Sequence, residues 1–263
     1  EMSASLVGSE MCIRDSLSTT DNRIEDVQRV LNEKYNNQEH ISVYVKQLDT
    51  DRVAAINDEK SMYAASIAKL GVLYYAQERL SQKKLSLSNE YQYTSTVNGF
   101  PGAYDPDGSG KISKMTDDKN YSLENLLKAV AQNSDNVATN ILGYYVANQY
   151  DNSFQKSVDK ASATSWNMDK KELTARAAGT LMEAIYRQNG DIINYLSSTD
   201  YDGERISKNI DVPVAHKIGD AYDFKHDVAI VYTDSPFILS IFTDKEGYDK
   251  ITSIADDVYG ILK

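Results

Sequence analysis

The residues Ser66-Ile67-Ala68-Lys69 stand where a turn-like run passes into a strongly helical one, 67–80. A serine hydroxyl is a poor nucleophile at neutral pH and needs a base within hydrogen-bond reach. If Ser66 begins the helix, Lys69 lies on the same face one turn later, with its amine close to the serine oxygen. The free N–H groups and the positive dipole of the helix start lie beside the same atom. The stretch therefore predicts a nucleophilic serine, although a plain helix cap at Ser66 fits the same four residues.

The segments around this stretch alternate between helical and strand periodicity. Apolar spacing predicts helices over 22–35, 67–80, 121–132, 136–149, 174–187 and 251–262. Alternating β-branched runs predict strands over 40–48, 52–56, 212–218, 228–232 and 237–242. Because strands come from both ends of the chain and helices from its middle, we predict an α/β (α+β) fold. Its antiparallel sheet is built from both termini and covered by helices, with an inserted all-helical subdomain.

The composition is that of a globular protein and excludes some partners. The chain has 263 residues, 41% hydrophobic and 25% charged, with a net charge of −11. Phosphate binding depends on concentrated Lys and Arg, so this acidity argues against nucleic acid. No run approaches eighteen apolar residues, so we expect no membrane span. We expect a monomer with a single catalytic domain over 17–263, its α/β part at about 20–66 and 206–263 and its helical part at about 67–205.

The first sixteen residues lack both a basic leader and a continuous apolar segment. They also have no clear periodicity and resemble translated adapter sequence. We expect residues 1–16 to be a non-native or disordered leader, which would make Cys12 foreign to the native protein. Cys12 is the only cysteine of the chain, so no internal disulfide can form.

Two further motifs follow Ser66-x-x-Lys69 along the chain. Ser134-Asp135-Asn136 lies at a helix junction, and Lys217-Ile218-Gly219 lies on the first of the late strands. In order and approximate separation the three motifs resemble those of the class A β-lactamases and the penicillin-binding serine hydrolases. The resemblance runs from about residue 22 to the C-terminus and includes Asn140, at the position of the family's helix asparagine. It implies a β-lactamase/transpeptidase-like fold.

The resemblance also implies roles for the motif residues. Ser66 would attack an amide carbonyl, and a neutral Lys69 would take its proton, which needs a lysine pKa lowered by burial and by Lys217. Ser134 would relay a proton to the leaving nitrogen, and Lys217 would face the substrate carboxylate. Asn136 would bind the substrate's side-chain amide, and Gly219 would let the substrate lie close to the strand edge. The backbone N–H groups of Ser66 and Asp220 would form the oxyanion hole.

The chain departs from the family pattern in two places. The interval 137–173 is about a dozen residues shorter than expected and lacks the Glu-x-x-x-Asn pattern of the glutamate that activates water for deacylation. Asp169 and Glu172 are the nearby carboxylates, and neither has a matching context. Ile218 replaces a Thr or Ser that donates a hydrogen bond to the substrate carboxylate, which should weaken recognition. We therefore expect slow deacylation.

Other constellations carry less chemistry. The run from Asp105 to Ser113 follows the first nine positions of an EF-hand calcium loop, but position twelve is Thr116 instead of a bidentate Glu. A plain polar surface loop is the favoured reading. The histidines His40, His216 and His226 lack zinc-ligand spacing. We expect no metal and no cofactor.

The resulting functional hypothesis is a serine hydrolase that forms an acyl-enzyme on Ser66 with a small-molecule β-lactam or a peptidoglycan stem peptide. Two alternatives stay open: a D-Ala-D-Ala peptidase of the penicillin-binding type, and a catalytically silent family member that acts as a binding domain. Either enzyme reading implies an extracellular or cell-surface location, with any signal or anchor lying outside this sequence.

Overall fold

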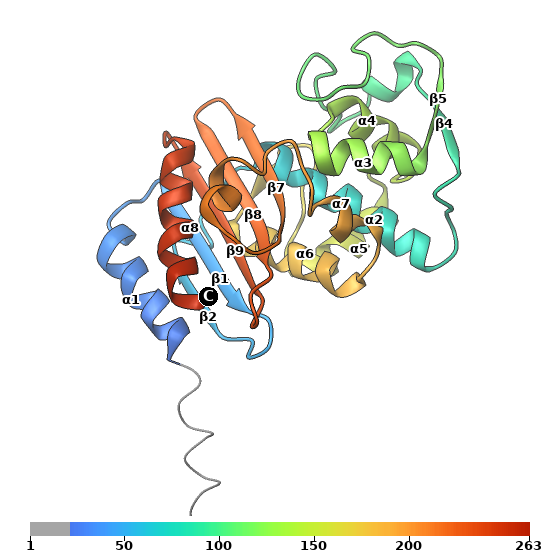
Figure 1. Ribbon diagram of the computed structural model, residues 1–263. Coiled ribbons are helices and arrows are strands. Elements are labelled where there is room, and N and C mark those ends of the chain that lie inside the picture. Colours follow the sequence, from blue (N-terminus) through green and yellow to red (C-terminus); the bar gives the residue numbers. More distant parts are fainter. Residues whose placement is uncertain (1–21) are drawn as a thin grey trace, which may run out of the picture.

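The computed structural model describes residues 22–263 of the chain (Figure 1). The predictions for residues 1–16 and for Cys12 lie outside the described residues. Two parts are visible: a sheet flanked by helices, and a mainly helical part beside it. The nucleophile motif lies where the chain first leaves the sheet for the helical part.

A five-stranded antiparallel sheet forms the centre of the α/β part, with the strand order β2-β1-β9-β8-β7. The strands are β1 (Ile41–Gln47), β2 (Val53–Ile56), β7 (Val214–Ala221), β8 (Phe224–Val231) and β9 (Phe237–Asp244). The N-terminal strand β1 pairs with the C-terminal strand β9, with Tyr44 opposite Ser240. This pairing confirms the prediction of an antiparallel sheet built from both ends of the chain.

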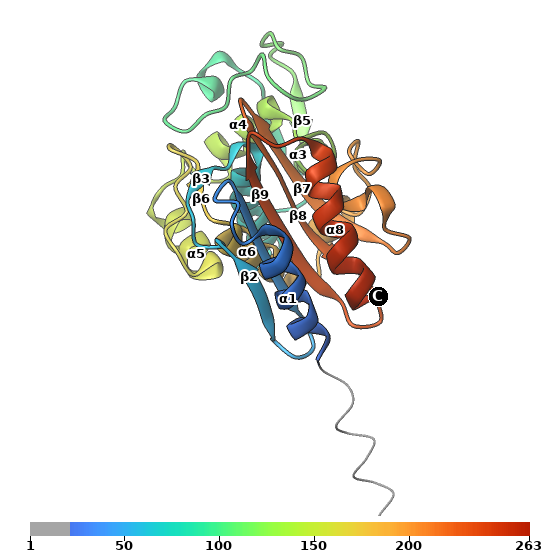
Figure 2. The same ribbon diagram turned by 90° about the vertical axis from the view of Figure 1, so that its left-hand side faces the viewer.

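The two faces of the sheet bury different residues, as strand alternation requires. Val43 and Val45 of β1 pack in one apolar cluster with α1 (Arg23–Tyr35) and α8 (Tyr248–Leu262). Tyr44 faces the opposite way, into a larger cluster shared with α6 (Ala175–Gln188) and the helical part. Figure 2 shows α1 and α8 side by side over one face of the sheet. The other face is therefore the one that supports the site.

The helical part contains most of the remaining elements. The 3₁₀ turn η3 (Arg205–Asn209) packs against α8 and β8 and so belongs to the α/β part. The elements of the helical part are the 3₁₀ turns η1 (Ala65–Lys69) and η2 (Ser95–Asn98), and the helices α2 (Leu70–Ser81), α3 (Leu123–Asn133), α4 (Asn136–Tyr145), α5 (Asn152–Ser162) and α7 (Asp191–Tyr195). Two small antiparallel pairs complete it: β3 (Met62–Tyr63) with β6 (Glu172–Leu173), and β4 (Glu90–Gln92) with β5 (Asn120–Ser122).

The structure differs from the predicted elements at several points, among them the short helix α7 and the pairs β3–β6 and β4–β5, which were not predicted. Helix α5 was not predicted, because its sequence is mostly polar and buries few apolar side chains, such as Phe154 and Val158. Helix α4 ends at Tyr145, short of the predicted 149, since three successive residues, Asn148 to Tyr150, adopt positive φ. The stretch after Ser66 begins as the 3₁₀ turn η1 before the α-helix starts at Leu70.

Candidate active site

Ser66 lies in a tight turn at the floor of a pocket of about 200 Å³. Ala65, immediately before it, has φ +49, a left-handed conformation that is costly for a residue with a Cβ. The hydroxyl of Tyr104 donates a hydrogen bond to the carbonyl of Ala65 at 3.1 Å. The pocket, called here the Ser66 pocket, is lined by Tyr63, Ala65, Ser66, Ala103, Tyr104, Asp105, Gly108, Ser109, Asn136, Lys171 and Ala221. The strained turn thus presents Ser66 to an open space.

Lys69 is completely buried beneath this pocket. Its amine donates to the backbone carbonyl of Ser134 and to Asn136 Oδ1, both at 2.6 Å, and lies 3.4 Å from Ser134 Oγ. These are its partners in the described chain, so the predicted contact with the Ser66 hydroxyl is not formed as a hydrogen bond. The amine is held instead at the junction of α3 and α4, where Ser134 and Asn136 lie. Catalytic hydrogen bonds are often long in unliganded sites and tighten when substrate binds.

The surroundings of Lys69 favour a neutral amine. Burial lowers the pKa of Lys69 well below that of a free lysine, and the charges of Lys217 and Lys171 lower it further against the opposing carboxylate of Asp135. A neutral amine has two N–H groups and one lone pair. The carbonyl of Ser134 and the side chain of Asn136 use both N–H groups, so the lone pair is available to accept a proton.

Ser134 connects Lys69 to a second buried lysine. It is the C-cap of α3 with φ +54, which turns its completely buried hydroxyl into the site. Lys217 on β7 donates to Ser134 Oγ at 2.7 Å and to the carbonyl of Ile218 at 3.0 Å. Burial, and then the charge of Arg205, lower the pKa of Lys217 to about 7, against Asp227. Lys217, Ser134 and Lys69 therefore form one continuous chain of polar contacts.

Asp135 and Asn136 hold the adjacent loop against this chain. Asp135 Oδ1 caps helix α4 by accepting from the amide of Ala138, and its Oδ2 accepts from the amides of Lys111 and Ile112. Asn136 Nδ2 donates to the carbonyl of Asp105 at 2.8 Å. Asp135 is thus a structural residue, and the amide of Asn136 already has a partner that a substrate would have to share or replace.

The edge strand β7 brings the third motif to the Ser66 turn. A Cβ on Gly219 would lie 2.7 Å from the carbonyl oxygen of Ala64 and 2.8 Å from Ile67, so glycine is required here for β7 to pack on η1. The amide of His216 donates outward from the sheet, to the carbonyl of Leu196. By alternation along an edge strand, the amide of Asp220 faces the same way, which is the orientation that the predicted oxyanion hole requires.

Arg205 joins the site from η3, and the motif search did not identify it. Its guanidinium is buried and pairs with the carboxylate of Asp220 at 2.8 Å, so the side chain of that residue is held in an ion pair. Ile218 is 5% exposed and has no hydroxyl to offer a carboxylate. The positive charge of Arg205 also lowers the pKa of Lys217.

Tyr104 and Asn140 form a second connection that sequence reasoning only partly identified. Asn140 Oδ1 accepts from the amide of Tyr104 at 2.7 Å, and its Nδ2 donates to the Tyr104 carbonyl at 2.8 Å. The ring of Tyr104 lies 4.5 Å from the amines of both Lys69 and Lys171. The family position of Asn140 was the available signal, whereas nothing local distinguished Tyr104 within its loop.

The segment before α6 packs directly on η1, the 3₁₀ turn that contains Ser66. Trp166 is completely buried and donates its indole N–H to the carbonyl of Ala68 at 3.1 Å. Asp169 and Glu172 are both exposed and do not line the Ser66 pocket. Among the residues that do line it, Asp105 is the one carboxylate. Within residues 22–263 no group of three or more His, Cys, Asp or Glu side chains is placed to hold a metal.

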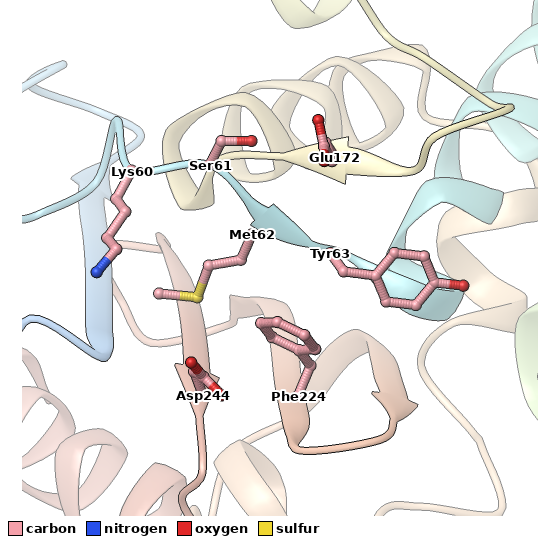
Figure 3. Close-up of a pocket in the computed structure, with 7 residues that line it drawn as sticks. All are labelled: Lys60, Ser61, Met62, Tyr63, Glu172, Phe224 and Asp244. Atoms are coloured by element: carbon pink, nitrogen blue, oxygen red, sulfur yellow. The ribbon is translucent and has the colours of Figure 1, made fainter.

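A second pocket, of about 370 Å³, shares Tyr63 with the Ser66 pocket (Figure 3). We call it the Met62 pocket; it is lined by Lys60, Ser61, Met62, Tyr63, Glu172, Phe224 and Asp244. Tyr63 lines both pockets, and the centroid of its ring lies 6.1 Å from that of Phe224. The serine and the lysine that line the Met62 pocket, Ser61 and Lys60, are exposed, whereas Ser66 and Lys69 are buried.

The fold defines the class of protein: an antiparallel sheet and a helical subdomain in the arrangement of the β-lactamase-family serine hydrolases. The model of the Beta-lactamase enzyme family matches residues 22–262, and the chain belongs to that family. No curated protein matches the sequence. None of the helices described between residues 22 and 263 is long and apolar enough to cross a membrane.

Solved structures share this fold at low sequence identity. PBP-A is 16% identical with a TM-score of 0.73, over 92% of this chain and 96% of that one. A variant of PBP-A, solved as an acyl-enzyme complex with penicillin G, is 15% identical with the same TM-score and coverage. The TLA-3 extended-spectrum beta-lactamase is 14% identical with a TM-score of 0.75, over 91% of this chain and 99% of that one. At this identity the likeness establishes the fold alone.

Proposed function

We propose that the chain is a serine hydrolase of this family that forms an acyl-enzyme on Ser66 with a β-lactam or a cell-wall peptide amide. The observation that carries the proposal is the continuous contact from Lys217 through Ser134 to Lys69, beneath a pocket that exposes Ser66. A structural role alone does not require two buried lysines to meet at one serine hydroxyl, because buried charges are costly.

In the proposed reaction each of these groups has a defined role. Ser66 Oγ attacks the amide carbonyl carbon, its proton passes to the lone pair of Lys69, and the backbone amides of Ser66 and Asp220 bind the developing oxyanion. The C–N bond then breaks, Ser134 delivers its proton to the leaving nitrogen, and the proton held by Lys69 passes to Ser134 Oγ, 3.4 Å away. The acyl group remains on Ser66, and Lys217 offers its charge to the carboxylate on the leaving side.

Deacylation is expected to be slow because the Ser66 pocket, as residues 22–263 line it, contains no base placed to activate water. The carboxylate in the Ser66 pocket, Asp105, is exposed, and its Oδ1 accepts from the amide of Asp107 in its own turn. Lys171 faces the same pocket, where it donates to two carbonyl oxygens as an ammonium group would. A protonated amine cannot take a proton from water.

Intact-mass spectrometry after incubation with benzylpenicillin tests the proposal. We expect a persistent mass increase equal to one penicillin in the wild type and none in Ser66→Ala. The matched control is Ser61→Ala, which removes a hydroxyl nearby in the chain and should keep the adduct. No adduct and no hydrolysis in the wild type would leave the silent binding domain as the better reading. Rapid hydrolysis would contradict the account of deacylation, and release of D-alanine from a stem peptide would favour the peptidase.

We further propose that the chain works as a monomer outside the cell or at its surface, since cell-wall peptides are found there. Light scattering of the purified protein tests the first point, where a stable dimer would contradict it. Fractionation of cells that express the complete protein tests the second, where recovery only with the cytoplasm would contradict it.

A further inference from the structure

A third lysine, Lys171, faces the Ser66 pocket, and none of the three motifs accounts for it. Its backbone is fixed on both sides: its amide donates to the carbonyl of Asn167 at 2.9 Å, and its carbonyl accepts from the amide of Ala64 at 2.7 Å. The residue adopts φ +54, which closes the turn between Trp166 and β6. The backbone of Lys171 is therefore hydrogen-bonded directly to the segment that leads into the Ser66 turn.

The ammonium group of Lys171 is held by dipoles. Its Nζ donates to the carbonyls of Gly102 at 3.1 Å and Met168 at 2.8 Å, and lies 4.5 Å from the centroid of the Tyr104 ring. Two carbonyl oxygens and an aromatic ring favour the charged form of an amine. An ammonium has three N–H groups, and only two are used here. Because the side chain is 6% exposed and lines the Ser66 pocket, this unused capacity is open to a ligand in that pocket.

Lys171 also lacks a direct counter-ion. Between residues 22 and 263 no carboxylate lies within ion-pair distance of it, although many other lysines have such a partner, for example Lys111 with Asp200 at 2.6 Å. Burial lowers the pKa of Lys171, and the carboxylate of Asp169 acts against that effect from farther away. A buried ammonium without a counter-ion is expensive unless a ligand supplies one.

We propose that Lys171 is a specificity-determining residue that binds a carboxylate on the acyl side of the substrate. This inference rests on the proposed function. Lys171 shares the Ser66 pocket with Asn136, the residue assigned to the acyl side chain, whereas Lys217 lies beneath the pocket with Ser134 on the leaving side. The site therefore favours acyl donors with two negative charges, one for each lysine. In a chain with a net charge of −11, such selection has to come from local cations.

A matched pair of penicillins tests the proposal, since carbenicillin is benzylpenicillin with one added carboxylate on the side chain. The second-order rate constant of acylation is measured for each by intact mass over time. We expect Lys171→Met to lower the ratio of the carbenicillin constant to the benzylpenicillin constant by about tenfold or more, the range of a hydrogen bond to a charged group. Lys170→Met, which removes the exposed neighbouring charge, should leave the ratio unchanged. Lys171→Arg should retain most of the preference.

The outcomes separate this inference from the proposed function. A wild type that neither forms an adduct with nor hydrolyses either penicillin overturns both. A wild type that is acylated, with a ratio that Lys171→Met does not change, overturns the inference alone, as does an equal fall in both rate constants. If Lys171→Met does not fold, the wild-type ratio decides: a carbenicillin constant more than tenfold below that of benzylpenicillin contradicts the proposal, and an equal or higher one supports it.

Discussion

The ammonium nitrogen of Lys217 lies 2.7 Å from the hydroxyl oxygen of Ser134, and both side chains are buried. Burial and the charge of Arg205 bring the pKa of Lys217 to about 7. Near neutral pH, Lys217 therefore changes between a cation that can attract the substrate carboxylate and a neutral amine that cannot. We therefore expect the protonation state of Lys217 to control the rate of acylation.

The rate constant of acylation should fall as pH rises through about 7, because Lys217 loses its proton there. The second-order constant reports the free enzyme, so the midpoint of the fall should lie near this pKa. Lys217→Arg keeps the charge at all accessible pH values and should move the descending limb above pH 9, even if the rate is lower. A wild-type rate that stays constant from pH 6 to 9 would contradict the assignment.

Stability should be greatest near pH 6.5, because two buried histidines titrate in opposite directions. Burial acts to lower the pKa of His216, but Asp227 and Asp202 together raise it to about 9, so its contribution is complete below 6.5 and is lost as pH rises through 9. Burial lowers the pKa of His226 to about 4, so its contribution is complete above 6.5 and is lost as pH falls through 4. Each change is worth about 3 kcal/mol in the free energy of unfolding. Urea denaturation from pH 4 to 9 measures it.

Asp227→Asn provides the control for the alkaline side of that profile. Asp227 lies 3.0 Å from His216 Nδ1 and is completely buried. Without this charge the decline between pH 6.5 and 9 should largely disappear, while the decline toward pH 4 remains. If the free energy of unfolding of Asp227→Asn falls as much between pH 6.5 and 9 as that of the wild type, groups other than His216 cause the alkaline decline.

Gly110→Ala should disrupt the loop that lies against Asp135. A Cβ at this position would lie 2.3 Å from Asp135 Oδ2, and the backbone has φ +127, a conformation that residues with a Cβ rarely adopt. We expect a loss of about 2 kcal/mol or more in the free energy of unfolding, together with slower acylation. Gly203→Ala is the matched control, because its Cβ would meet no atom within 4 Å. Equal stability of the two variants would show that this loop contributes little.

Tyr104→Phe should weaken the turn that carries Ser66. The substitution removes the hydrogen bond that the buried hydroxyl of Tyr104 donates to the carbonyl of Ala65. The expected cost is about 1–2 kcal/mol of stability, with a lower acylation rate because the strained φ of Ala65 loses support. Tyr222→Phe serves as the control, since Tyr222 is 85% exposed. An acylation rate unchanged in Tyr104→Phe would contradict this role.

The sheet was predictable because its evidence is local. The alternation of Ile41, Val43 and Val45 predicted β1, and the buried runs near the C-terminus predicted β7 to β9. The register was not predictable in the same way, since the pairing of Tyr44 with Ser240 joins residues far apart in the chain. Helix α5 escaped prediction because the tertiary contacts of Phe154 and Val158 stabilise an otherwise polar segment.

The candidate site was predictable where residue types recur at known spacings, and not elsewhere. The three motifs named Ser66, Ser134 and Lys217, which the fold brings together. Lys170 and Lys171 have the same residue type and neighbouring positions, yet only the second is buried at the pocket. That difference depends on the positive φ of Lys171 and on carbonyls from another loop, so no single-sequence pattern contains it.

The position of β1 between β2 and β9 affects how the chain can fold. The ribosome synthesises β1 and β2 early, but β9, the other neighbour of β1, follows almost two hundred residues later. The entire helical part lies between them in the sequence. Until β9 is synthesised, one edge of β1 remains unpaired and open to association with other chains. The Ser66 turn packs on β7, which pairs with β9 through β8. A nascent chain should therefore be aggregation-prone and unable to bind penicillin until its last strand is complete.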